Sequence, residues 1–239
     1  MTSFPGIAPG ALVFPDDAGP SRYRELLRDA RASGRCPVWF GATAASRVGM
    51  MDMPADPIGE IDAADPAGVL AGWAPSPCPP GCTCLEPFTE GFPSDLVRSG
   101  SSDRSQEERT FRVASEFGGD WGPIAPMGVV EAARPADVPA VLAWGGIGNY
   151  PHQDLVGLSA VLRSWEERFG AVLVLLGPAT LVLSVADPPR TRGTAERVAA
   201  EHFAFCPDQH DPQDGVTVHT PRTYARMIRG ARSWRFWWD

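Results

Sequence analysis

The stretch that decides the fold is Ala171–Ala186, which reads AVLVLLGPATLVLSVA. Two apolar runs rich in valine and leucine flank the short segment Gly177–Ala179. Short apolar runs separated by a turn that contains glycine and proline are typical of two strands in a hairpin. We therefore expect this stretch to form two adjacent strands of a sheet.

The segments on either side of this hairpin alternate between helical and extended patterns. Their order is strand, helix, helix, hairpin, helix, helix and strand, which predicts an α+β fold with helices packed on a mixed β-sheet. The expected elements are a strand at 127–132, helices at 135–144, 154–170, 191–207 and 220–231, and a final strand at 233–239. The helix at 154–170 has the clearest pattern because its apolar residues recur at helical spacing.

The final strand carries three of the eight tryptophans of the chain within residues 234–239. Alternation places Trp234, Phe236 and Trp238 on one face of this strand. Burial of each such aromatic side chain contributes roughly 2–3 kcal/mol of transfer free energy. We therefore expect a strand that is buried in the sheet, and not an exposed aromatic binding motif.

The part of the chain before residue 124 contains two regions of different composition. Residues 1–73 contain helical and strand patterns, including a short helix that Asp65 caps and Pro66 begins. Residues 74–123 are dense in proline, glycine and serine, which is typical of a linker or an irregular excursion. We therefore expect three parts: an N-terminal α/β region at 1–73, this linker or excursion at 74–123, and a C-terminal α+β domain at 124–239.

The composition excludes several classes of function. The net charge is −8 and 44% of the 239 residues are hydrophobic, so the chain can form a core and lacks the positive charge typical of nucleic-acid binding. All 21 positive charges are arginine, which excludes lysine Schiff-base chemistry and the P-loop lysine. No apolar run reaches the roughly 18 residues of a membrane span, and the first residues do not resemble a signal peptide. We expect a cytoplasmic protein with reduced cysteines and neither a membrane nor a nucleic acid as partner.

Three of the five cysteines are close together in the sequence, at Cys78, Cys82 and Cys84. Thiolates at short spacing are ligands that Zn²⁺ prefers, and Cys36 or Glu86 could supply a fourth ligand. Structural zinc sites usually pair two Cys-x(2–4)-Cys units, whereas this chain has one irregular cluster. The spacing therefore favours a proline-rich loop with free thiols or an adventitious disulfide. No cofactor is predicted, and zinc is the alternative.

A second group of candidate residues lies near the end of the helix expected at 191–207. His202 and Cys206 are four residues apart and share one helix face, and Pro207 would let Asp208 or His210 fold back toward them. This is the candidate catalytic group, either a His/Cys/His metal site or a Cys–His pair in which the imidazole lowers the pKa of the thiol. The apolar residues on the same face favour the alternative of a core histidine and a buried cysteine.

A third group follows the glycine-rich segment that begins at Gly145. It consists of Asn149, His152 and Asp154, which could line a binding pocket. The glycines do not match a G-x-G-x-x-G or Walker pattern, so the alternative is an ordinary turn that leads into the next helix.

Three stretches of the chain together resemble a known family. They are LSAVLRSWEERFGAVLVLLGPATLVLSVADPPRT at 158–191, AAEHFAFCPD at 199–208 and WRFWWD at 234–239. In this order and spacing they resemble the bacterial family called domain of unknown function 4253, which is frequent in actinomycetes, over residues 127–239. The segment 58–73 resembles the upstream part of longer members more weakly. The resemblance implies no established activity, and the cysteine cluster departs from the family pattern.

Two functions from different classes remain open. The favoured one is a non-catalytic protein-binding module, which by analogy with small acidic proteins could resemble the immunity proteins of bacterial conflict systems. The alternative is a metal- or thiol-dependent hydrolase centred on His202, Cys206 and His210.

Overall fold

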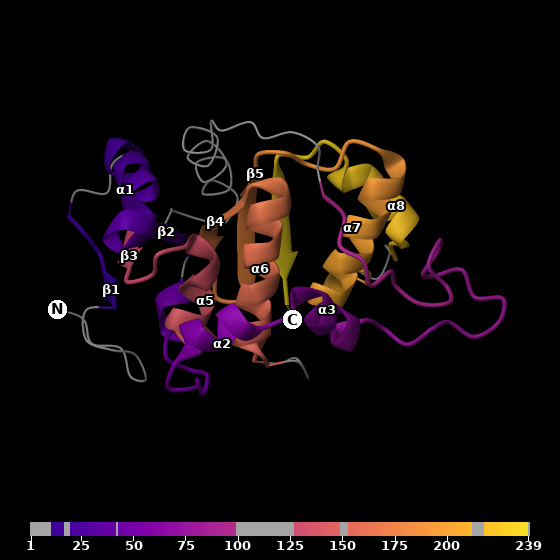
Figure 1. Ribbon diagram of the computed structural model, residues 1–239, viewed down its shortest axis with the longest axis horizontal. Helices are drawn as coiled ribbons and strands as arrows, with labels where there is room; N and C mark the ends of the chain where they lie inside the picture. The colour runs from indigo at the N-terminus through magenta and orange to yellow at the C-terminus, as the bar shows by residue number, and fades with distance from the viewer. Residues whose placement is uncertain are drawn as a thin grey trace.

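The computed structural model describes residues 11–16, 20–41, 43–98, 127–148, 153–211 and 218–238. A six-stranded sheet with the order β1-β3-β2-β4-β5-β6 runs through the centre of the molecule (Figure 1). Its strands are β1 (Leu12–Val13), β2 (Cys36–Phe40), β3 (Met127–Val130), β4 (Ala171–Leu176), β5 (Thr180–Val185) and β6 (Ser233–Trp237). Strands β2 and β4 are parallel and the other neighbours are antiparallel. The expected α+β class with a mixed sheet is confirmed.

Helices pack on this sheet. They are α1 (Pro20–Ser33), α2 (Pro57–Ala63), α3 (Pro66–Trp73), α5 (Val138–Val141), α6 (Leu155–Phe169), α7 (Arg192–Phe205) and α8 (Pro221–Ile228). Of these, α2, α3, α6, α7 and α8 begin after residues whose side chains accept from free backbone N–H groups. The Asp65 carboxylate accepts hydrogen bonds from two backbone N–H groups at the start of α3, and Thr220 forms a capping box with Thr223 at the start of α8. Gly170 ends α6 in the left-handed conformation.

The two outer parts of the chain contribute to the same sheet. Strand β3 lies between β1 and β2, so a strand from the second half of the chain is hydrogen-bonded on both sides to strands from the first 40 residues. Residues Trp39 and Phe40 of β2 then pair with Leu175 and Leu176 of β4. Residues 1–73 and 124–239, which we expect as separate parts, therefore share one sheet.

Helices cover both faces of the sheet. On one face, α6 packs on β4 and is surrounded by α2, α3 and α5, while α7 and α8 pack together at one end of the molecule (Figure 1). This face holds the main core, which includes the largest buried side chains of α6 and β6. On the other face, α1 contributes Tyr23, which packs with Met127 and Val129 of β3.

The helix expected at 135–144 is shorter than its sequence pattern predicts. The segment forms a 3₁₀ turn, η2 (Pro135–Asp137), and the single turn of α5. Beyond this turn, Ala143 adopts a positive φ of 47°, and the backbone N–H groups of Gly49 and Met50 bind the carbonyl oxygens of Leu142 and Ala143. The apolar pattern predicted too long a helix because the residues after Val141 are buried by tertiary contacts and not by continuation of the helix.

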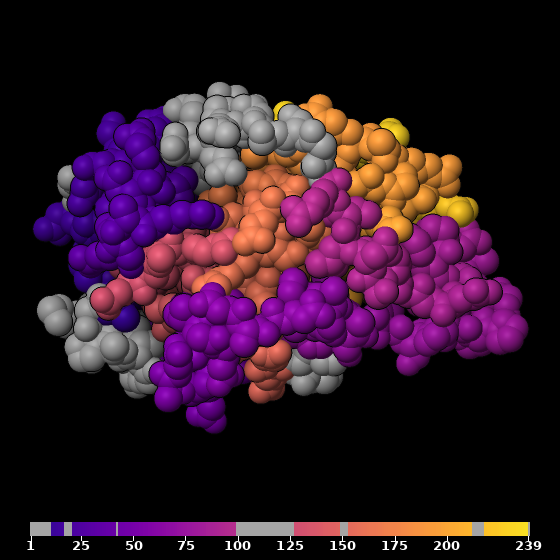
Figure 2. All heavy atoms as spheres, viewed as in Figure 1, coloured from indigo at the N-terminus to yellow at the C-terminus, as the bar shows by residue number. Residues whose placement is uncertain are grey.

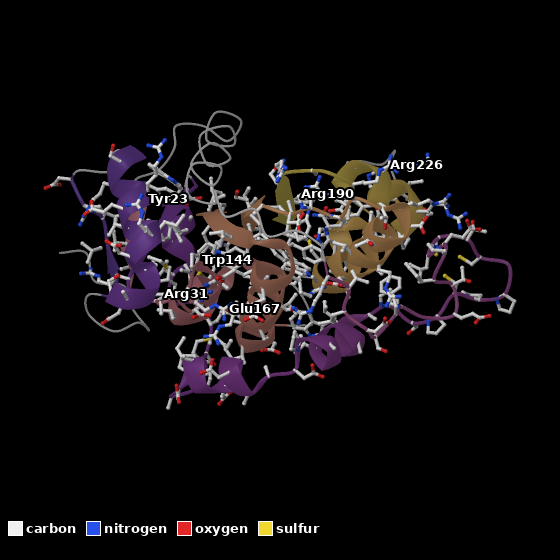
Figure 3. The ribbon with its side chains drawn as sticks, turned by 45° about the horizontal axis from the view of Figure 1, so that its top comes forward. Tyr23, Arg31, Trp144, Glu167, Arg190 and Arg226 are labelled. Atoms are coloured by element: carbon white, nitrogen blue, oxygen red, sulfur yellow. The ribbon has the colours of Figure 1, made fainter. Side chains whose placement is uncertain are left out.

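The predicted hairpin at 171–186 is confirmed. Trp144, which lies outside the hairpin, forms a hydrogen bond with its turn. The indole Nε1–H of Trp144 donates to the carbonyl oxygen of Gly177 at 2.9 Å in the interior. Figure 3 labels Trp144 between the sheet and the helices. The backbone N–H of Trp238 donates to the carbonyl oxygen of Ala179 at 3.0 Å, and the rings of Trp144 and Trp238 meet edge to face.

The predicted burial of the last strand is also confirmed. Trp234, Phe236 and Trp238 expose 3% or less of their surface, while Arg235 on the opposite face is exposed. Strand β6 pairs with β5 and lies at the end of the six-stranded order. Its outer edge is covered by η4 (Pro207–Gln209), because Gln209 Nε2 donates to the carbonyl oxygen of Arg235.

Residues 74–98 form the irregular excursion of the fold, with turns and neither helix nor strand. The rest of the segment predicted as a linker, 99–123, lies outside the described residues. Among the helices that the structure describes, none combines the length and the apolar character that a membrane crossing requires.

Candidate functional site

The excursion at 74–98, which we call the thiol loop, is held against α6, α7 and α8 by three arginines. Arg222 of α8 donates to Glu86 Oε2 at 2.8 Å, and Arg197 of α7 donates to the carbonyl oxygen of Asp95 at 2.9 Å. Arg168 of α6 donates to the carbonyl oxygen of Val97 at 2.8 Å. In Figure 2 the thiol loop lies directly against the surface of α7 and α8. A proline-rich segment without secondary structure is thereby fixed in position.

Turns within the thiol loop bring its three cysteines together. The N–H of Cys82 donates to the carbonyl oxygen of Pro79, and the N–H of Cys78 donates to that of Thr89. The Sγ atoms of Cys78 and Cys84 are 3.3 Å apart, and those of Cys82 and Cys84 are 3.1 Å apart. All three sulfur atoms lie within 4.8 Å of one another. The three cysteines that the sequence predicts as candidate metal ligands thus lie close together in the structure.

Two of the three thiols, those of Cys82 and Cys84, differ in acidity. The pKa of Cys82 is lowered because its sulfur receives hydrogen bonds, first from the backbone N–H of Cys84 and then from the neighbouring thiols. The pKa of Cys84 is raised to about 12, mainly by its hydrogen bonds with the thiols of Cys82 and Cys78. The surroundings therefore favour the thiolate of Cys82 and disfavour that of Cys84.

The two suggested fourth ligands are not equally placed. Cys36 lies in the interior strand β2, fully buried in the main core, and is not part of the thiol group. Burial raises the pKa of its thiol. Glu86 is in the thiol loop, but its carboxylate is paired with Arg222 at 2.8 Å.

A cavity of about 540 Å³ lies between the thiol loop and the end of α7. One wall consists of loop residues that include Cys78, Cys84 and several prolines, and the other includes Trp73, Phe203 and His210. Its walls are mainly apolar. The cavity is therefore large enough for an apolar side chain or a short segment of a ligand.

His210 faces this cavity in a fixed orientation. Its Nδ1 lies 2.6 Å from the carbonyl oxygen of His219, and the backbone N–H of His219 donates to the carbonyl oxygen of His210. A carbonyl oxygen can only accept, so Nδ1 carries the hydrogen and Nε2 is the basic nitrogen. His210 is thus associated with the thiol loop and not with Cys206, its expected partner.

His202 lies in the aromatic core. Its ring is fully buried, within 5 Å of the ring centroids of Trp165, Trp234 and Phe236. Tyr224 donates its hydroxyl hydrogen to Gln209, so its oxygen accepts from His202 Nδ1 at 3.2 Å. Burial, with a contribution from Arg168, lowers the pKa of His202 well below 6.5. The imidazole is therefore a neutral core group.

Cys206, the other half of the proposed Cys–His pair, is also buried. Its thiol donates to the carbonyl oxygen of Trp237 at 3.0 Å. Burial raises the pKa of this thiol to about 12. A reactive cysteine needs a thiolate and access to solvent, and neither is provided here. Asp208 lies beyond it in η4 and is buried as well.

The glycine-rich turn serves packing. Gly145 and Gly146 belong to the buried 3₁₀ turn η3 (Gly145–Ile147). A side chain on Gly146 would collide with the indole of Trp144, which explains the need for glycine at that position. Of the three predicted binding residues that follow, Asp154 caps α6 by accepting from the N–H of Gly157 at 2.8 Å. Asn149 and His152 lie outside the described residues.

A second hollow, of about 400 Å³, lies over α6 and is lined by several arginines. Three of them, Arg134, Arg163 and Arg168, are engaged in ion pairs. Arg163 binds both carboxylate oxygens of the buried Asp137, and Arg134 binds Glu166 and Glu167. Because these positive charges are already paired with carboxylates, they are not available to hold an anion in this hollow.

The sequence did not reveal the cavity or the arginines that hold the thiol loop. The contact between Arg222 and Glu86 spans 136 residues of sequence, and that between Arg197 and Asp95 spans 102. Contacts over such separations leave no local pattern. The proline content of the loop was the one available signal, and it indicates irregular structure without indicating where the loop docks.

Comparisons with known proteins support the resemblance seen in the sequence. Residues 126–239 match the model of a family described as "Domain of unknown function (DUF4253)". The match leaves the weaker segment at 58–73 and the thiol loop outside. Neither the curated proteins nor the solved structures contain a match to the chain. The resemblance to the DUF4253 family is therefore confirmed for residues 126–239.

Proposed function

We propose that this chain is a non-catalytic protein-binding protein, and that the cavity beneath the thiol loop receives an apolar segment of its partner. The observation that carries the proposal is the cavity itself, which is mainly apolar and lies at the surface between an irregular loop and the end of α7. Apolar pockets with a few polar groups at the rim are the usual form of a recognition site.

The location of the candidate catalytic residues favours binding over catalysis. A hydrolase centred on His202, Cys206 and His210 would need these side chains to converge at one accessible point. His202 and Cys206 are fully buried, and His210 lies on the cavity wall. The thiol of Cys206 has a raised pKa, which is unfavourable for a nucleophile.

Charge indicates the kind of partner that would associate readily. The chain carries a net charge of −8, so its field attracts basic proteins and repels nucleic acids and anionic surfaces. The free thiol state of all five cysteines supports a reducing, cytoplasmic location. We therefore infer a cytoplasmic partner with an apolar binding segment and a basic surface.

The test uses a matched pair of charge-introducing variants. Ser76 is exposed and lines the cavity, so Ser76→Arg places a guanidinium at the binding surface without disturbing the core. Ala32, on the exposed side of α1 at the opposite end of the molecule, gives the control variant Ala32→Arg. A partner captured from the native host with the wild-type chain would be purified, and its binding to all three proteins measured by calorimetry.

We expect Ser76→Arg to weaken binding at least tenfold and Ala32→Arg to leave the dissociation constant unchanged. A partner that binds wild type and Ser76→Arg equally would contradict the location of the site. Failure to find any partner, together with hydrolytic turnover that disappears in Cys206→Ala, would overturn the non-catalytic function in favour of the hydrolase.

A further inference from the structure

We propose that Cys78, Cys82 and Cys84 form a three-thiolate binding site for zinc whose fourth coordination position opens into the cavity beneath the thiol loop. The site shares this cavity with the proposed partner-binding site, but the case for a metal rests on the arrangement of the sulfur atoms and does not require a partner. Its ligands come from seven consecutive residues, and their sulfur atoms all lie within 4.8 Å of one another.

The donor set matches the chemistry of zinc. Thiolate sulfur is a soft ligand that selects Zn²⁺ and Cu⁺ over Mg²⁺ and Ca²⁺. Zinc binds sulfur at about 2.3 Å with tetrahedral angles, which corresponds to about 3.8 Å between two bound sulfur atoms. The observed separations of 3.1 and 3.3 Å are about half an ångström shorter. A small outward movement of these half-buried side chains would therefore complete the geometry.

The loop backbone prepares the site for this movement. Cys82 follows Gly81, whose φ of +84° lets the chain reverse between the first and second ligands. The hydrogen bond from Cys78 N–H to the carbonyl oxygen of Thr89, at 3.1 Å, joins the first ligand to the chain beyond the last one. Arg222 anchors the segment to α8 through Glu86. The ligands are thus held near one another before a metal binds.

The three thiols are better suited to a metal than to a disulfide. The Sγ atom of Cys84 is nearly equidistant from those of Cys78 and Cys82, so either disulfide would leave the third thiol beside it without a partner. A metal uses all three. Cys78 and Cys84 also line the cavity, so a metal between them would present its remaining position there. His210 faces the same cavity, but it is not part of the close group of ligand atoms.

The first experiment measures metal uptake by the full, tag-free chain after chelation in reducing buffer. We expect one zinc ion per chain by mass spectrometry of the metal. When cobalt replaces zinc, the absorption spectrum should show thiolate-to-cobalt charge-transfer bands and the intense visible bands of a tetrahedral site. Cys82→Ser and Cys84→Ser should each lose stoichiometric binding. Cys206→Ser makes the same chemical change at a buried thiol outside the group and should keep it.

The second experiment tests the open position. Addition of imidazole should change the visible spectrum of the cobalt form, because a ligand can enter only where a coordination position is open. His210→Ala should keep one metal per chain. Loss of metal in His210→Ala would overturn the open position and make His210 the fourth ligand.

Two results would overturn the site altogether. One is metal uptake that Cys82→Ser and Cys84→Ser retain while circular dichroism shows them folded like wild type. The other is a disulfide in the thiol loop, found by thiol counting in the reduced and desalted chain, with no uptake of zinc or cobalt. Neither result bears on partner binding, which Ser76→Arg tests separately.

Discussion

The aromatic core around Trp165 and the thiol loop hold cysteines in opposite environments. In the core, Cys206 is buried and its pKa is raised, while His202 is surrounded by aromatic rings and its pKa is lowered, so both side chains stay neutral. In the thiol loop, the pKa of Cys82 is lowered because hydrogen bonds stabilise its thiolate. The acidity of a cysteine in this chain therefore depends on whether its sulfur is buried or receives hydrogen bonds, and not on its residue type alone.

The two regions also differ in the interactions that stabilise them. The core is held by aromatic burial and by the buried ion pair of Arg168 with Glu201, in which both guanidinium–carboxylate contacts are 2.9 Å or shorter. The thiol loop is held mainly by contacts with half-exposed arginines. The exception is the hydrogen bond that Arg168 donates to the carbonyl oxygen of Val97. The comparison predicts that the two regions respond very differently to substitution.

The largest effect is expected from removal of the core face of the last strand. Deletion of residues 234–239 removes Trp234, Phe236 and Trp238, each of which would cost about 3–5 kcal/mol as an alanine substitution. The sum is on the order of 10 kcal/mol, which is comparable to the whole stability of a typical domain. We expect the truncated chain to lose cooperative thermal unfolding by circular dichroism. A sharp, wild-type-like transition would show that the strand is not part of the core.

An intermediate effect is expected from acid, through His202. Its folded pKa lies well below 6.5, so below pH 6.5 the unfolded chain binds a proton that the folded chain does not. This stability is present above pH 6.5 and is lost as the pH falls, by up to ~1.4 kcal/mol per pH unit. We expect wild type to lose more unfolding free energy than His202→Gln between pH 6.5 and 5 in urea unfolding. Parallel pH profiles for the two proteins would contradict a neutral buried imidazole.

The smallest effect on global stability is expected in the thiol loop. Arg222 and Glu86 are each 38% exposed, so loss of their ion pair in Arg222→Gln should cost about 1 kcal/mol or less. The loop should nevertheless open more often, because this contact docks it to α8. We expect faster cleavage within residues 74–98 by proteinase K at an almost unchanged melting temperature. Arg226→Gln, on the exposed surface of α8 labelled in Figure 3, is the control and should be cleaved like wild type.

The regular parts of the fold could be predicted from local patterns. The hairpin at 171–186 and helix α6 follow from apolar periodicity, and the starts of α3 and α8 follow from Asp65 and Thr220 before proline. The burial of Trp234, Phe236 and Trp238 follows from their alternation. Each of these features depends on residues that are close in sequence, and their physical signal is therefore visible without the fold.

The sequence by itself thus determined the α+β class, the family of residues 126–239, the buried last strand and the identity of the three clustered cysteines. Only the tertiary structure decided that β3 lies between β1 and β2, that His202 and Cys206 belong to the core, and that His210 shares a cavity with Cys78 and Cys84. The physical reason is that burial, pKa and docking depend on contacts between residues far apart in the chain. Arg222 and Glu86, 136 residues apart, are one such pair.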